Sequence, residues 1–175
     1  MTQYSKRIVI VHWLTLALLI ASWYLGEDLA EATDASKATL AGYIVHIAVG
    51  GVVLLLTLFR FNFRRNDGIP APVGDTAMDR LANGVHYLLY TLLLVLPVSG
   101  VVILLTSKAG PALLAFDANM LPKEHGYRGV FAHEVHEQMF NVLIVLVVIH
   151  ILGAIKHQYI TKDGLMERMM LRRKD

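Results

Sequence analysis

Apolar residues in this 175-residue chain gather in four long runs that polar stretches separate. These runs predict helices at about 8–25, 40–59, 85–105 and 133–158. Each run supplies close to the roughly 20 residues that a helix needs to cross about 30 Å of hydrocarbon. The pattern therefore predicts an all-α membrane protein, a four-transmembrane-helix bundle that forms a single domain over residues 1–175.

Composition agrees with this class of protein. Hydrophobic residues make up 55% of the chain and charged residues 17%, which is too apolar for one soluble domain. The length is too short for a large transporter. Lys6 and Arg7 precede the first run as in a signal peptide, but the run is long for that role and no small-x-small cleavage site follows it. We expect a retained first helix and no nucleic-acid partner.

The distribution of Lys and Arg predicts the orientation, because four spans place both termini on one side. That side carries 12 of the 16 basic residues: Lys6, Arg7, Arg60, Arg64, Arg65, Arg80, Lys156, Lys162, Arg168, Arg172, Arg173 and Lys174. The positive-inside rule then puts both termini of this multi-pass protein in the cytoplasm. Residues 60–80 are expected to form a cytoplasmic loop, and residues 111–120 a short interfacial helix on the outer side.

The outer segments carry few bases and more acids. The bases are Lys37, Lys108, Lys123 and Arg128; the acids are Glu27, Asp28, Glu31, Asp34, Asp117, Glu124, Glu134 and Glu137. Net charge alone would not steer a small anionic reactant to this side.

Four histidines lie inside the apolar runs: His12, His46, His136 and His150. An ionisable group at membrane depth costs free energy, so each is a candidate functional residue. A single such histidine could equally serve as a structural hydrogen-bonding group. Their depths, however, match in two pairs, with His46 beside His136 on the outer side and His12 beside His150 on the inner side.

The spacing within the fourth run supports this pairing. His136 and His150 are fourteen residues apart, which is about 3.9 helical turns, so both face nearly the same way about 21 Å apart. Two facing imidazole pairs at two depths are what two six-coordinate haems in a helical bundle would require. Gly50, Gly51 and Gly153, each near a histidine, would leave room for a flat macrocycle, although small residues also serve ordinary helix packing.

The chain has no cysteine. Covalent haem attachment through C-x-x-C-H, a cysteine-ligated iron–sulfur cluster and a disulfide are therefore excluded, and any haem must be a non-covalent b haem. Zinc is a competing prediction, because His133 and His136 are one turn apart and other ligand types are near them in sequence, namely Glu134, Glu137 and His125. Such a site would lie at the outer surface and would leave His12 and His150 unexplained.

Several short elements occur here in the order of a known family: Tyr4-Ser5-Lys6-Arg7 with His12-Trp13-Leu14, His46-x-x-x-Gly50, Leu96-Pro97-x-x-Gly100, and His136 to His150 with His157. Together they resemble the bacterial cytochrome b561 family over essentially the whole chain. The plan is also similar to the membrane cytochrome b subunits of formate dehydrogenases and nickel–iron hydrogenases. The resemblance implies two b haems, with iron bound by His46 and His136 on the outer side and by His12 and His150 on the inner side.

One small member of that family is a superoxide oxidase, and this chemistry is our leading hypothesis. The resemblance implies an enzyme, a superoxide:quinone oxidoreductase that passes electrons from periplasmic superoxide to ubiquinone. His157 and His86 are candidate proton donors or quinone contacts, because imidazole titrates near neutral pH. Lys108, Lys123 and Arg128 are the outer cations that could attract superoxide.

Two alternatives remain open. The chain could instead be a cytochrome b conduit between a periplasmic dehydrogenase or carrier protein and the quinone pool, since an acidic outer surface suits a basic partner. It could also be a haem-free membrane protein that binds a divalent metal or acts as a scaffold. The second alternative predicts no Soret absorption band.

Overall fold

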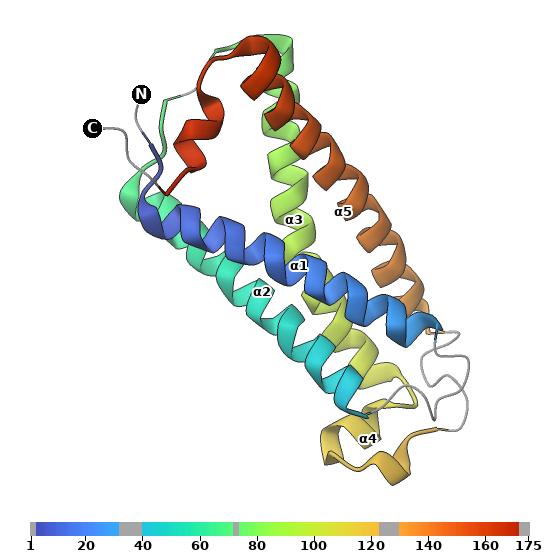
Figure 1. Cartoon of the computed structure of the whole chain (residues 1–175). Coiled ribbons are helices and arrows are strands. Elements are labelled where there is room, and N and C mark those ends of the chain that lie inside the picture. Colours follow the sequence, from blue (N-terminus) through green and yellow to red (C-terminus); the bar gives the residue numbers. More distant parts are fainter. Residues whose placement is uncertain (1–2, 32–39, 72–73, 123–129, 172–175) are drawn as a thin grey trace.

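The computed structural model describes residues 3–31, 40–71, 74–122 and 130–171, without the side chains of residues 30 and 31. Within these ranges the chain is helical and contains no strand (Figure 1). The long helices are α1 (Lys6–Glu31), α2 (Leu40–Asp67), α3 (Ala77–Thr106) and α5 (Phe131–Lys156). All four are long and apolar enough to cross a membrane, which confirms the predicted four-helix membrane fold.

The long helices pack as two hairpin-like pairs. α1 lies along α2 and α3 lies along α5, while a smaller contact between α2 and α3 joins the pairs (Figure 1). The most completely buried large side chains are Ile8 and Val9 of α1 and Leu143 of α5. Few other residues of the long helices are buried, because most of their apolar surface faces outward, as expected of helices that lie in lipid.

The two ends of the bundle differ. The terminal end contains the first described residues, the end of α2, the start of α3 and the described residues that follow α5 (Figure 1). The opposite end, called the α4 end here, contains the short helix α4 (Gly110–Ala115) and a single 3-10 turn, η1 (Ala118–Met120). These two elements cover most of residues 111–120, the stretch for which a short helix was predicted, and α4 begins one residue before it.

The helices extend further than the apolar runs indicated. α2 continues to Asp67 and α3 begins at Ala77, so the expected loop at 60–80 is only about half as long as predicted. Arg64 and Arg65 lie in the last turn of α2, where cations interact favourably with the helix dipole. Thr76 and Asp79 form a capping box that starts α3 well before its apolar run.

The terminal end is held together by the segment that follows α5. A π-helical turn, η2 (His157–Thr161), and a 3-10 turn, η3 (Leu165–Met169), bring this segment back toward α1 (Figure 1). Arg168 is 9% exposed and donates to the carbonyl of Ala71 at 2.7 Å. The backbone N–H of Tyr4 donates to the carbonyl of Arg168, so both described ends of the chain meet here.

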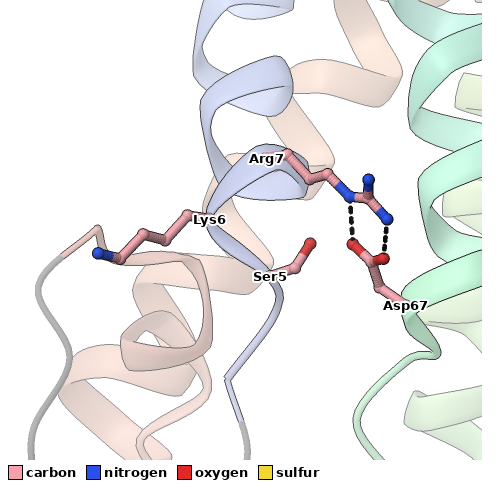
Figure 2. A pocket seen from close by; sticks show the side chains of 4 residues that line it. All are labelled: Ser5, Lys6, Arg7 and Asp67. Carbon is pink, nitrogen blue, oxygen red and sulfur yellow. Dashed lines mark hydrogen bonds and ion pairs between the residues drawn. The ribbon is translucent and has the colours of Figure 1, made fainter.

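An open surface hollow of about 600 Å³ also lies at the terminal end (Figure 2). Ser5, Lys6, Arg7 and Asp67 line it, and Arg7 forms a two-pronged ion pair with Asp67 that ties the start of α1 to the end of α2. None of the predicted site residues lines this hollow, so the candidate chemistry lies elsewhere.

Candidate functional site

The structure brings together the two histidines assigned to the inner side. His12 projects from α1 and His150 from α5, and their ring centroids are 6.2 Å apart with planes at 80°. Both side chains are only partly buried. This pair lies toward the terminal end of the bundle.

A second pair lies toward the α4 end. His46 of α2 and His136 of α5 have ring centroids 6.4 Å apart, with planes at 66°. Both rings are again partly buried. The helix α5 thus contributes one histidine to each pair, and α1 and α2 contribute the other two.

These separations match what one metal ion between two imidazoles demands. Two metal–nitrogen bonds of about 2.0–2.1 Å, on opposite sides of the ion, place the ring centroids about 6.3 Å apart. The observed 6.2 and 6.4 Å lie on either side of this value. The planes of each pair are far from parallel, so the two rings meet edge to face and are not stacked.

Glycines leave space near the histidines. A Cβ added at Gly50, Gly51 or Gly153 would meet no atom within 4 Å, which agrees with the room expected there for a macrocycle. Two other glycines allow close approach instead. A Cβ at Gly26 would lie 3.4 Å from Cε1 of His46, and one at Gly100 would lie 3.8 Å from Cε1 of His136.

Ser99 determines which ring nitrogen of His136 carries hydrogen. The Ser99 hydroxyl donates its single hydrogen to the carbonyl of Leu96 at 2.7 Å, and its Oγ lies 2.8 Å from Nδ1 of His136. Since that hydrogen is already used, Oγ accepts from an Nδ1–H. The Nε2 of His136 is then the nitrogen with a free lone pair, as a metal ligand requires.

Arg60 contacts Nδ1 of His12, as Ser99 contacts Nδ1 of His136. Its Nη1 lies 2.9 Å from Nδ1 of His12. The sequence pattern placed Arg60 in a cytoplasmic loop, whereas it belongs to α2 and its side chain points into the bundle. No pattern in the sequence distinguishes it from the neighbouring arginines.

His86 of α3 lies beside the same pair. Its ring centroid is 5.0 Å from that of His150, with planes at 74°. Sequence reasoning found no partner for His86, because the contact joins helices that are far apart in the chain. Three imidazoles therefore gather near the terminal end.

His157 forms a hydrogen-bonded pair with an acid that sequence reasoning did not select. Nδ1 of His157 lies 2.5 Å from Oδ2 of Asp163, and Oδ1 of Asp163 accepts from the backbone N–H of Leu165. Desolvation raises the pKa of Asp163, but the bonds from His157 and Leu165 outweigh this effect and hold that pKa below its ordinary value. The contact depends on the π-helical turn after α5 and on the left-handed conformation of Lys162, and the sequence pattern predicted neither of them.

The candidate outer cations are placed only in part. Lys108 is exposed in the turn between α3 and α4, at the α4 end. Arg128 and Lys123, the other two candidates, lie outside the described residues, as does His125. His133 and Glu134 lie in the first turn of α5, and the described residues contain no group of three or more side chains arranged as a metal site there.

Comparisons with known proteins match nearly the whole chain. The family model described as prokaryotic cytochrome b561 matches residues 3–171. Cytochrome b562 of Cereibacter sphaeroides is 32% identical over 177 residues, covering 97% of this chain and 98% of that protein. Cytochrome b561 homolog 1 of Escherichia coli is 28% identical, covering 99% and 100%. The probable superoxide oxidase CybB of Yersinia pestis is 26% identical, covering 96% of each chain.

Proposed function

The chain belongs to the prokaryotic cytochrome b561 family, and we propose that it is a di-haem superoxide:ubiquinone oxidoreductase of the bacterial inner membrane. Membership makes it a multi-pass membrane protein that binds haem b and transfers electrons. A haem-free scaffold or metal-binding protein does not fit this family.

The separation within each histidine pair carries the proposal. His12 and His150 would bind one haem iron, and His46 and His136 would bind the other. Two pairs with centroids 6.2 and 6.4 Å apart, stacked along one bundle, suit two six-coordinate b haems. When bound, the two haems supply one-electron redox centres at two depths in the membrane.

The side chains around the pairs prepare them for this role. Ser99 holds His136 in the tautomer whose Nε2 can bind iron. Gly50, Gly51 and Gly153 leave open space beside the histidines of both pairs. The partly buried rings are consistent with a group that fills the remaining space.

Superoxide is the proposed donor, since one relative is named a probable superoxide oxidase. Two superoxide anions each lose one electron and become O₂, and one ubiquinone takes these two electrons and two protons to become ubiquinol. Lys108, exposed at the α4 end, is a proposed cation that attracts superoxide, and Arg128, outside the described residues, is the other candidate. By the positive-inside rule this end faces the periplasm and both termini face the cytoplasm.

Ubiquinone is proposed to react at the terminal end, where His86 and His157 lie. His157 is the better candidate for delivering a proton, because Asp163 orients its imidazole and can stabilise it when charged. His86 is a candidate quinone contact beside His150. Protons for the quinone would then come from the cytoplasm.

One observation favours a second candidate function. The segments predicted from the sequence to lie on the outer side carry eight acids and four bases, which suits a basic periplasmic donor protein better than a small anion. In that case the chain would be a conduit between this partner and the quinone pool. Both functions use the same histidine pairs.

The proposal is tested on the full chain purified in mild detergent. We expect two b haems per chain by pyridine haemochrome, reduction of both haems by superoxide alone, and reoxidation by a ubiquinone analogue. His46→Leu and His12→Leu should each leave one haem. A chain that holds two haems but is not reduced by superoxide would support the conduit instead, and one haem per chain would contradict the pairing.

A further inference from the structure

Two arginines meet one tyrosine beside the pair His12 and His150. The guanidinium carbons of Arg60 and Arg64 lie 5.5 and 5.7 Å from the ring centroid of Tyr90 on α3. Arg64 also lies 6.0 Å from the ring of Tyr4. Tyr90 therefore contacts two positive charges that come from successive turns of α2.

Polar atoms in this cluster lack partners among the described residues. Nε of Arg60 and the hydroxyl of Tyr90 are both buried and make no hydrogen bond there. Buried donors without acceptors cost free energy, and most buried polar atoms in proteins are satisfied. Both atoms could donate to the same acceptor, because both belong to side chains that contact each other.

No acid compensates the two charges within the described part of the chain. The ion pairs found there leave out Arg60 and Arg64: they are Arg7–Asp67, Arg80–Asp75 and His157–Asp163. Contact with an aromatic ring attracts a cation but does not neutralise it. Arg60 lies within a membrane-spanning helix, where charged groups pair with other groups or line a functional site.

The contact between Arg60 and His12 points the same way. A guanidinium can only donate, so Nδ1 of His12 must accept, and its hydrogen then resides on Nε2. A histidine in that tautomer cannot offer Nε2 to iron. If His12 is an axial ligand, Arg60 must donate to a different acceptor when haem is bound.

We propose that Arg60, Arg64 and Tyr90 form a carboxylate-binding site that holds a propionate of the haem between His12 and His150. This inference rests on the proposed function. Arg60 and the Tyr90 hydroxyl would donate to this carboxylate, the positive charge of Arg60 would be neutralised, and Nδ1 of His12 would be released. Haem binding and the tautomer of His12 are thereby coupled through the side chain of Arg60.

The test compares haem b with its dimethyl ester, which has no carboxylates. The full chain is stripped of haem and titrated with each form. In the wild type we expect one of the two sites to bind the ester at least tenfold more weakly through loss of this contact. Arg60→Met should remove that discrimination, whereas Arg65→Met, an exposed arginine on the same helix, should keep it.

A second measurement is made on protein isolated with its natural haem. Arg60→Met removes a positive charge near the iron and should lower the midpoint potential of one haem. A tenfold change in the equilibrium constant of a one-electron reduction corresponds to about 59 mV. Arg60→Lys keeps the charge, so it should retain part of the wild-type discrimination against the ester and part of the wild-type midpoint potential. If Arg60 were only structural, Arg60→Lys would show no discrimination between the two haem forms.

The outcomes separate this inference from the proposed function. A wild-type chain that takes up no haem would refute the function itself. Two bound haems with equal ester discrimination in the wild type and Arg60→Met would refute only the propionate site. If the haem midpoint potential changed with anionic lipid but not with esterification of the haem, Arg60 would be assigned to a lipid phosphate. This result would overturn the inference.

Discussion

At the residue scale, the second ring nitrogen of each histidine decides whether the first can bind iron. Ser99 is an acceptor for Nδ1–H of His136, whereas Arg60 is a donor to Nδ1 of His12. The contact with Ser99 leaves Nε2 of His136 free to bind iron, whereas the contact with Arg60 keeps a hydrogen on Nε2 of His12. The two pairs are alike in ring separation but not in their hydrogen-bonding partners.

Ser99→Ala removes the acceptor for His136 and should weaken haem binding at the pair with His46. Partners of metal-ligating histidines commonly change metal affinity by about 10–100-fold, so we expect a loss of at least tenfold at this site. Haem release to apomyoglobin measures it. Thr106→Ala is the matched control, because Thr106 also bonds a backbone carbonyl of α3 without contacting a histidine. Equal haem release from the two variants would contradict a role for Ser99.

Asp163 predicts a pH dependence of stability. Its pKa is held below the ordinary value in the folded protein, so its ionised form stabilises the fold above the pKa of the unfolded chain, about 3.9. This contribution is lost as pH falls through the folded pKa. Asp163→Asn should therefore melt at a lower temperature than the wild type at pH 7, and the difference should shrink below about pH 4. Asp75→Asn, an exposed acid at the same end, is the control.

A constant difference between Asp163→Asn and the wild type at all pH values would show that the effect comes from packing and not from the charge. Scanning calorimetry in detergent gives both melting temperatures.

At the element scale, the apolar runs predicted all four long helices but not where they end. The run in α2 stops at Phe59, yet the helix continues through Arg60, Arg64 and Arg65, whose long side chains can reach polar surroundings from a helical backbone. The start of α3 depends on Thr76 and Asp79, a local capping signal outside any apolar run. Hydropathy locates the part of a helix that lies in lipid, and caps locate its ends.

The sequence likewise predicted one part of the candidate site and not the other. The pairing of His12 with His150 and of His46 with His136 followed from helix order and depth, which the sequence contains. The contacts of Ser99, Arg60 and His86 depend on the rotation of each helix about its own axis. Helices with apolar residues on most of their surface leave that rotation undetermined in the sequence.

Close packing of α1 against α2 near Gly26 makes a further prediction. A Cβ at this position would lie 3.4 Å from the His46 ring, so the larger side chain in Gly26→Val should displace that ring and lower haem content from two toward one per chain. Gly84→Val on α3 is the control, since an added Cβ there meets nothing within 4 Å. Haemochrome spectra of both variants decide the matter, and an unchanged haem content in Gly26→Val would count against His46 as a ligand.

At the scale of the whole molecule, α5 connects the two proposed redox sites. It contributes His136 and His150, while each partner histidine comes from the other helix pair. Both sites therefore span the boundary between the α1–α2 pair and the α3–α5 pair. Binding at either site should hold the two helix pairs together, so haem would support the fold as well as the electron path.

The same arrangement gives electron flow a direction that single replacements can test. His46→Leu removes the site at the α4 end, so superoxide should no longer reduce the remaining haem at an appreciable rate, although dithionite should. His12→Leu removes the site at the terminal end, so superoxide should still reduce the remaining haem while ubiquinone analogues fail to reoxidise it. Stopped-flow spectra at the Soret band measure both reactions. If His12→Leu blocked reduction by superoxide and His46→Leu blocked reoxidation by quinone, the proposed direction would be reversed, because each substrate would then react at the opposite end of the bundle.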